Sequence, residues 1–252
     1  MDDLLVSARG RISLVTINRP RKANALTTDM QARLTKHLKE AGAEETIGAL
    51  VITGGSGSVF CAGADVQESS DILSPAEFAD LRSARMFELL GAVLTCPKPV
   101  VVALNGHAVG SGCLLAFVAD ARVAVAQASF SLPEILRGRP TFAGAAVVSR
   151  LLGDVAATDL VQTGRRMTFD EAARRGLISA AAEPDELVEK AVELAQTLAR
   201  QGEAFALNKQ WINEGFVERL AEAQRRSAEQ RRAGSARPDA VPDASRARRR
   251  QG

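Results

Sequence analysis

The sequence is poor in the side chains on which several enzyme classes depend. It contains no tyrosine and only two histidines, His37 and His107. Phenol-based acid catalysis is therefore excluded, and a histidine-rich metal centre cannot be assembled. A Ser-His-Asp triad would have to use one of these two histidines. His37 lies in an amphipathic helical pattern, which favours a solvent-exposed position.

Cysteines and long apolar runs are also scarce. Cys61, Cys96 and Cys113 are odd in number and lack paired spacing, which argues against a disulfide framework and a structural zinc site. No apolar run approaches the roughly 18 to 20 residues that cross a bilayer, so we expect no membrane partner. The first residues, MDDLLVSARGR, fit neither a secretory signal nor a transit peptide. We therefore expect a cytoplasmic protein.

The rest of the 252-residue chain reads as an ordinary globular protein of the α/β class. It is 46% hydrophobic and 25% charged with a net charge of +2, and its length suits a single α/β unit. Apolar and glycine patterns predict strands at 11–18, 49–53, 99–104 and 122–126. They predict helices from 27 or 28, at 75–94 and 113–119, and then at 155–162, 169–175, 184–200 and 203–232. We expect a core over 1–200 and a C-terminal helical region with a basic tail over 201–252, of which 233–252 frays or docks on another subunit.

Two of the predicted strands open into loops of small residues that lead towards helices. The first loop lies in Val59–Asp65 and the second in Gly110–Gly112. Small residues let backbone N–H groups approach a ligand, and two such donors aimed at one oxygen form an oxyanion hole. Each loop alone is more often a simple turn. Neither spells Gly-x-Gly-x-x-Gly and the chain has no Gly-Lys pair, so a nucleotide site is not favoured.

Four segments taken together are more specific than either loop. They are NRPRKANAL (18–26), FCAGADV (60–66), PKPVVVALNGHAVGSGC (97–113) and SLPE (131–134). In order and spacing the chain resembles the enoyl-CoA hydratase/isomerase (crotonase) superfamily across about residues 5–225, and LVQTGRR (160–166) with EAARRGL (171–177) fits the next family landmark. The resemblance implies an α/β fold with a crotonase-like ββα spiral core and a helical C-terminal region, assembled as a homotrimer or hexamer.

The resemblance also implies an acyl-CoA thioester substrate, with coenzyme A as part of the substrate and no tightly bound cofactor. The backbone N–H groups of Ala64 and Ser111 would be the oxyanion donors. The implied coenzyme A contacts are Arg21, Lys22, Ala23, Ala62, Asp65, Val66 and Lys209. For Arg21, Lys22 and Lys209, a solvated surface position is an equally good interpretation.

Family hydratases use two glutamates, and here the first of these positions is Leu114 while the second is Glu134. An aliphatic side chain at 114 disfavours hydration, because losing a positioned acid or base typically costs ~10²–10⁴-fold. Gly112-Cys113-Leu114 with one downstream glutamate is most similar to Δ3,Δ2-enoyl-CoA isomerases. We therefore expect Glu134 to act as a single acid/base whose pKa is raised by apolar neighbours. The alternative is that Ser131-x-x-Glu134 is only a helix-capping box.

Two further departures concern the acyl group. Arg139 and Phe142 stand where the family usually has a glycine-rich segment, and with Leu114 they are expected to shape the substrate pocket. A hydratase of fatty acid metabolism, a specialised decarboxylase and a non-catalytic acyl-CoA-binding paralogue remain alternatives, and the thiol carrier could be coenzyme A or a carrier protein.

The C-terminal arginines raise a separate question about nucleic acid. They are Arg225, Arg226, Arg231, Arg232, Arg237, Arg246, Arg248, Arg249 and Arg250. A basic tail can bind nucleic acid by counterion release. No aromatic residue follows Phe216 to stack on bases, so a solvated helix end is favoured and no nucleic-acid partner is expected.

Overall fold

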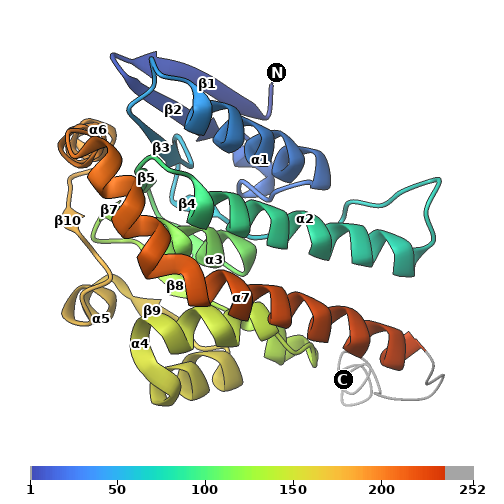
Figure 1. The fold of residues 1–252 in the computed structure, drawn as a ribbon. Coiled ribbons are helices and arrows are strands. Elements are labelled where there is room, and N and C mark those ends of the chain that lie inside the picture. The colour runs from blue at the N-terminus through green and yellow to red at the C-terminus, as the bar shows by residue number, and fades with distance from the viewer. Residues whose placement is uncertain (1, 236–252) are drawn as a thin grey trace.

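The computed structural model describes residues 2–235 (Figure 1). The expectation for 233–252, with the arginines from Arg237 onward, falls mostly outside this range. Within it, no helix combines the length and hydropathy needed to span a bilayer.

A six-stranded sheet forms one layer of the molecule. Its strand order is β1-β2-β3-β5-β7-β10, with β1 and β2 antiparallel and the other neighbours parallel. The strands are β1 (Leu4–Arg9), β2 (Ile12–Ile17), β3 (Ala49–Thr53), β5 (Val100–Leu104), β7 (Ala121–Ala124) and β10 (Ala180–Ala181). Every residue of β5 is buried, as its unbroken apolar sequence predicts for a parallel strand covered on both faces.

A four-stranded sheet in the order β4-β6-β8-β9 forms a second layer. Its strands are β4 (Val59–Cys61), β6 (His107–Val109), β8 (Ser129–Ser131) and β9 (Met167–Thr168). Along the chain β3, β5 and β7 enter the large sheet, and each is followed by a strand of the small sheet and then by helical structure. This repeat confirms the ββα spiral that the resemblance implied.

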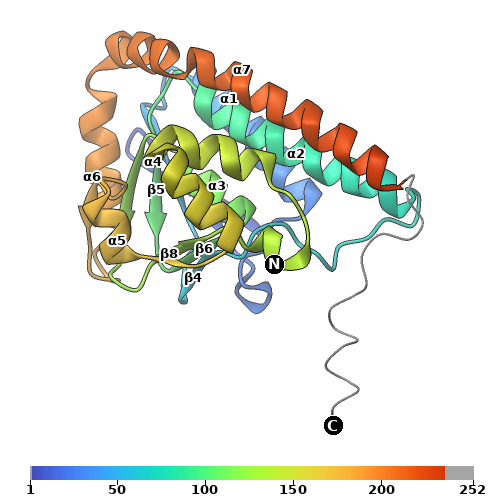
Figure 2. The same cartoon turned by 90° about the horizontal axis from the view of Figure 1, so that it is seen from below.

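Seven α-helices surround the sheets within the described range. They are α1 (Thr28–Ala43), α2 (Pro75–Thr95), α3 (Ser111–Val118), α4 (Phe142–Thr163), α5 (Phe169–Arg174), α6 (Leu187–Ala199) and α7 (Gly202–Ser235), with short 3₁₀ turns η1 (Pro20–Lys22) and η2 (Pro133–Arg137). The α7 helix runs beside α2 and also packs on α4 (Figures 1 and 2). The C-terminal part is therefore helical, as predicted, while a domain boundary near residue 200 stays a prediction.

Several elements differ from the sequence prediction, which gives no strand at β1, β4, β6, β8, β9 or β10. The last five of these span only two or three residues each, too few for an apolar alternation to mark them. The β1 strand was not predicted, because only its first residue is buried and an edge strand of this kind carries no apolar alternation. The α4 helix begins at Phe142 rather than near 155, because the Thr141 side chain accepts a hydrogen bond from the Gly144 N–H. Gly153 interrupts α4 at φ +81°, which explains why the helical pattern was recognised only after it.

Candidate active site

The small sheet brings three loops to one edge. Because β4, β6 and β8 are parallel neighbours, their carboxyl ends lie side by side. Ala62–Ala64 follow β4, Gly110–Ser111 follow β6, and Glu134 follows β8. Ligands of α/β proteins bind outside the carboxyl ends of such strands. The segments that carry the proposed chemistry therefore meet in space although about 70 positions separate Ala64 from Glu134.

The backbone of Ala64 is held by an isolated parallel bridge to Leu26. The Leu26 N–H donates to the Gly63 carbonyl at 2.8 Å, and the Asp65 N–H donates to the Leu26 carbonyl at 2.9 Å. In a parallel pairing of this kind, the bridged residue directs its own N–H to the opposite side. The Ala64 N–H therefore points away from Leu26.

The second loop lies close to the first. Ser111 is the first residue of α3, so its N–H is one of those without a partner inside the helix. A Cβ on Gly63 would lie 3.4 Å from the Ser111 N and 2.9 Å from the Val109 carbonyl oxygen. Only glycine at position 63 lets the two loops approach this closely, and its φ of +95° also favours glycine.

Glu134 lies beside the second loop. A Cβ on Gly110 would lie 3.2 Å from Oε1 of Glu134, and the Gly110 N–H donates to the Ser131 carbonyl at 2.9 Å. The Oε2 atom of Glu134 is buried and has no hydrogen-bond partner among the described residues. Burial raises the pKa of the Glu134 carboxyl, and its own backbone N–H and Arg137 only partly oppose this. The direction of the shift agrees with the sequence expectation.

The capping-box interpretation of Ser131 and Glu134 is wrong. Ser131 is the last residue of β8, and the residue that precedes η2 is Leu132, with no side-chain capping bond. The Glu134 carboxylate is therefore not used to secure a helix start. Leu136, one of the apolar residues near Glu134 in the sequence that were expected to surround it, is exposed to solvent.

The three residues expected to shape the acyl pocket lie in different environments. Leu114, on α3, is only 1% exposed and belongs to the hydrophobic core. Phe142, at the start of α4, is half-buried and packs against that core, whereas Arg139 is exposed. Leu114 is therefore an apolar side chain on the helix that begins with Ser111, whose N–H is the second expected donor.

The structure brings most of the expected coenzyme A contacts together. Ala23 is joined to Ala62 by a 3.0 Å hydrogen bond from the Ala62 N–H to the Ala23 carbonyl. Arg21 and Lys22 are exposed beside Ala23, and the Lys22 ammonium donates to Gln67 Oε1 at 2.7 Å. Val66 is also exposed. These residues form one accessible surface next to the Ala62–Ala64 loop.

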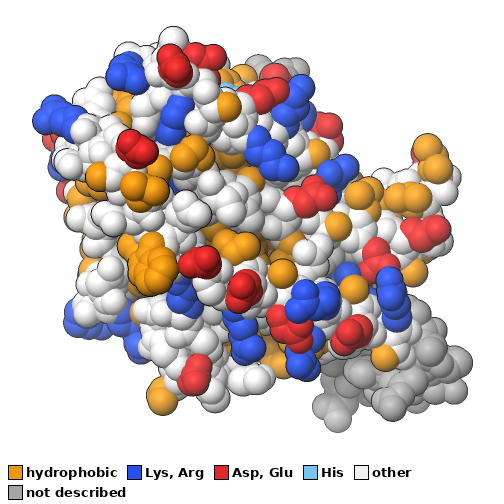
Figure 3. All heavy atoms as spheres, in the orientation of Figure 1, with side chains coloured by type: hydrophobic (Ala, Val, Ile, Leu, Met, Phe, Trp, Pro, Cys, Tyr) orange, Lys and Arg blue, Asp and Glu red, His pale blue; other side chains and the backbone are white. Residues whose placement is uncertain are grey.

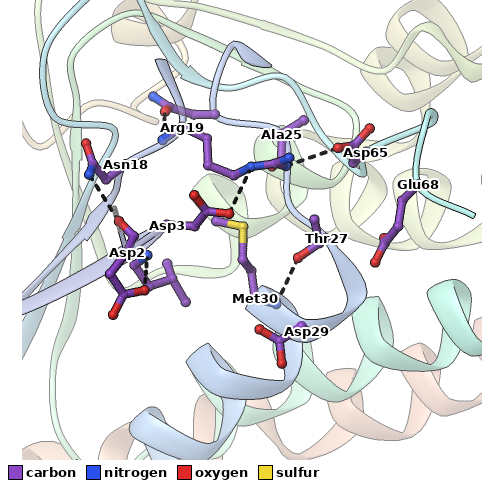
Figure 4. Close-up of polar contacts among 12 residues, drawn as sticks. Asp2, Asp3, Asn18, Arg19, Ala25, Thr27, Asp29, Met30, Asp65 and Glu68 are labelled. Atoms are coloured by element: carbon purple, nitrogen blue, oxygen red, sulfur yellow. Dashed lines mark hydrogen bonds and ion pairs between the residues drawn. The ribbon is translucent and has the colours of Figure 1, made fainter. Parts of the chain in front are cut away.

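Asp65 does not share that exposure. Its carboxylate accepts hydrogen bonds from the Gln67 N–H at 2.9 Å and from the Arg19 guanidinium at 3.1 Å (Figure 4). Burial alone would raise the pKa of Asp65, but the Gln67 N–H, Arg19 and Lys22 outweigh it, so the pKa lies below its ordinary value. The side chain is thus committed to the protein rather than to a ligand.

Lys209 departs from the expectation more clearly. It is 5% exposed, and its ammonium donates to Asp120 Oδ2 at 2.6 Å and to the Lys98 carbonyl at 3.3 Å. The same Asp120 oxygen accepts the Val100 N–H at 2.8 Å. The position of Lys209 on α7 therefore contradicts a role at the coenzyme A phosphates, because the charge is buried in an ion pair that joins α7 to the sheet.

A cavity lies elsewhere, away from these loops. Its volume is about 460 Å³ and its lining comes from the end of α3, from α4 and from the first half of α7, including Phe117, Val147 and Phe205. None of the loops at the carboxyl ends of β4, β6 and β8 lines it. The loops, rather than this cavity, form the candidate active site, because they bring the Glu134 carboxyl together with backbone amide donors.

Each of the two histidine side chains forms a hydrogen bond with a serine hydroxyl. His37 Nε2 lies 2.8 Å from Ser13 Oγ, and His107 Nδ1 lies 2.8 Å from Ser129 Oγ. Burial lowers the pKa of both imidazoles. His37 is half-buried rather than surface-exposed as expected, because Ser13 of β2 binds it. Within residues 2–235 no cluster of His, Cys, Asp and Glu could hold a metal ion.

Two residues near the site were given no role from the sequence. Asn24 is buried, with its amide nitrogen donating to the carbonyls of Gly54 and Val59 at 2.7 and 2.9 Å. Arg19 contacts Ala25 and Asp65. Both belong to the NRPRKANAL segment, but no spacing rule predicts contacts with residues so distant in the chain.

Comparison with known proteins gives a consistent result. Residues 7–237 match the family of enoyl-CoA hydratases/isomerases. The chain is 35% identical to a probable enoyl-CoA hydratase of Mycobacterium leprae, over 88% of this chain and 85% of that protein. It is 34% identical to a short-chain-enoyl-CoA hydratase of Clostridium acetobutylicum, over 86% and 83%. The crystal structure of an enoyl-CoA hydratase from Bacillus anthracis superimposes with a TM-score of 0.78 at 29% identity, over 90% of each chain.

Proposed function

The chain belongs to the enoyl-CoA hydratase/isomerase family, and we propose that this acyl-CoA enzyme catalyses isomerisation of an enoyl-CoA thioester. The thioester oxygen accepts hydrogen bonds from the N–H groups of Ala64 and Ser111. Glu134 removes a proton from C2 of a 3-enoyl thioester, and the resulting dienolate carries its charge on that oxygen. The double bond moves from C3–C4 to C2–C3 as Glu134 returns the proton to C4.

The observation that carries the proposal is the state of Glu134. A half-buried glutamate with a buried, unpartnered oxygen and a raised pKa suits a group that takes up and returns a proton. It lies next to Gly110, one residue before the proposed donor Ser111. A structural carboxylate in the same place would be expected to have hydrogen-bond partners.

Hydration is the second candidate, because the relatives reported above carry the names of hydratases. It would use the same oxyanion donors, and it would also need a group that orients water. Leu114 stands where the resemblance implies that group, and its side chain is apolar and buried.

Purified protein assayed with 3-enoyl-CoA and, separately, with 2-enoyl-CoA distinguishes the two. Isomerisation predicts gain of conjugated-thioester absorbance from the first substrate and little loss from the second. Rapid loss from the second would establish hydration and overturn the isomerase assignment. If neither reacts, while a titration shows thioester binding, the protein binds acyl-CoA without either reaction.

The remaining parts of the proposal concern binding and assembly. We assign coenzyme A to the surface formed by Arg21, Lys22, Ala23, Ala62 and Val66, where two cations are exposed. A homotrimer or hexamer is supported by apolar side chains exposed on α7, and hydrophobic side chains are visible over this helix in Figure 3. A cytoplasmic location stays a prediction.

A further inference from the structure

One guanidinium spans the bridge that orients the Ala64 N–H (Figure 4). Arg19 Nη1 donates to the Ala25 carbonyl at 2.6 Å and to Asp65 Oδ2 at 3.1 Å. Ala25 precedes Leu26, and Asp65 follows Ala64, and these two inner residues are the bridged pair. The Arg19 side chain therefore connects the two strands of the bridge at the residues beside it.

The ion pair of Arg19 and Asp65 is shielded from solvent. The side chains of Arg19 and Asp65 are 14% and 9% exposed. Their attraction is therefore screened less by water and salt than that of an exposed pair. The Nε of Arg19 also lies 3.2 Å from Asp3 Oδ2, so the guanidinium has partners on both sides.

Asn24 fixes the backbone from which Arg19 extends. Its Oδ1 accepts the Arg19 N–H at 2.9 Å, while its amide nitrogen donates to the Gly54 and Val59 carbonyls. Asn24 adopts φ +56°, a left-handed conformation that asparagine tolerates better than most residues. The segment that carries Arg19 is thus tied to the loop before β4 and to the first residue of β4.

We propose that Arg19 and Asp65 are positioning residues that hold the Ala64 N–H in the direction required by the thioester oxygen, an inference that rests on the oxyanion hole of the proposed function. Hydrogen bonds weaken steeply as the donor angle departs from linear. Removing one oxyanion donor typically costs ~10²–10³-fold in kcat. Misdirecting the donor should cost part of that, about 10-fold or more, and should affect kcat more than KM because the bond strengthens in the transition state.

The test uses two conservative variants of the full-length protein. Arg19→Lys keeps the charge but cannot reach Ala25 and Asp65 with one planar group. Asp65→Asn keeps the size of the side chain but weakens the bond to Arg19. The matched control is Arg33→Ala, which removes a 2.9 Å pair with Asp2 at an exposed site, where the side chains are 44% and 54% exposed.

Four quantities are measured for each variant. They are kcat and KM with 3-enoyl-CoA, the midpoint of thermal unfolding, and the near-ultraviolet absorbance of the enolate formed when acetoacetyl-CoA binds. We expect kcat and enolate absorbance to fall about 10-fold in Arg19→Lys and Asp65→Asn, with KM within about 2-fold and the pH profile of kcat unshifted because Glu134 sets it. The Arg19→Lys/Asp65→Asn double variant should be no worse than the poorer single variant, because the two residues act as one unit.

The outcomes separate this inference from the proposed function. If Arg19→Lys and Asp65→Asn isomerise 3-enoyl-CoA as fast as the wild type, the positioning role is refuted and isomerisation still stands. This holds even if both variants are less stable than the wild type. A wild type that enolises acetoacetyl-CoA without isomerising 3-enoyl-CoA would refute isomerisation, and the enolate signal of the variants would still decide the positioning role. No turnover and no enolate in the wild type would refute the oxyanion hole, and the positioning role with it.

Discussion

At the scale of single residues, Glu134 combines burial with an unpartnered oxygen. Such a carboxyl favours its neutral form more than a glutamate in water does. The folded protein therefore binds this proton more tightly than the unfolded chain does. The contribution of Glu134 to stability is present below the ordinary pKa of 4.5 and is lost as the pH rises through the folded value.

Glu134→Gln tests both aspects of this residue. Isomerase kcat should fall about 10²–10⁴-fold, because the proton carrier is lost. The wild-type acid limb of kcat/KM should lie above pH 4.5, since a base with a raised pKa must first lose its proton. The variant should unfold at the same or a higher temperature near neutral pH, measured by thermal denaturation as a function of pH. Full activity in this variant would sink the catalytic role of Glu134.

Leu114→Glu tests whether position 114 faces the reacting carbons. A second carboxylate there should raise hydration of 2-enoyl-CoA by about 10-fold or more over wild type. It should also lower the free energy of unfolding by about 1–3 kcal/mol or more, because position 114 is 1% exposed. Leu114→Gln controls for polarity without a charge and should not gain hydration. A folded Leu114→Glu protein with the wild-type hydration rate would remove Leu114 from the substrate pocket.

At the scale of elements, α7 is anchored by a buried charge. Lys209 crosses to Asp120, which follows α3 and also accepts the N–H of Val100 in β5. One carboxylate oxygen thus joins α7 to the large sheet. Removing one partner of a buried ion pair leaves the other charge buried without a partner. The resulting loss in folding free energy exceeds what the intact pair contributes.

Lys209→Met should lower the free energy of unfolding by about 3–5 kcal/mol in denaturant titrations. Lys190→Met is the control: Lys190 lies 2.7 Å from Glu186, but both side chains are about half exposed, so its loss should leave the free energy of unfolding nearly unchanged. Adding Asp120→Asn should recover part of the loss in Lys209→Met. If Lys209→Met instead raised KM for the thioester without changing stability, Lys209 would be assigned to the coenzyme A site.

At the scale of the whole molecule, α7 presents apolar side chains to solvent. Trp211 is 79% exposed, and Leu207 and Ile212 are exposed within a turn or so of it. Large exposed aromatic residues are typical of interfaces between protein subunits. Together with the trimers or hexamers implied by the family resemblance, this surface supports self-association through α7.

Light scattering after gel filtration measures the assembly. A chain of 26.7 kDa predicts about 80 kDa for a trimer (three times 26.7) and twice that for a hexamer. Trp211→Glu should reduce the mass, because a charge would be buried in the interface. Ile72→Glu alters another fully exposed apolar residue, in the loop before α2, and should leave the mass unchanged. A monomeric wild type would contradict the assembly.

The amino-acid sequence by itself determined what depends on neighbours along the chain: the buried strand at 99–104 and a helix that starts at Thr27 or Thr28. The role expected of Glu134 came from the family resemblance, because the local pattern Ser131-x-x-Glu134 also fits a capping box. Only the tertiary structure decided what depends on residues distant in sequence. The alternation of strands between two sheets brings Ala64, Ser111 and Glu134 to one edge. Packing of α7 buries Lys209, and Arg19 reaches Asp65 across 46 positions. Local sequence patterns indicate which face of an element is apolar, but not which distant element packs against that face. These ion pairs depend on that packing, so the sequence pattern alone does not predict them.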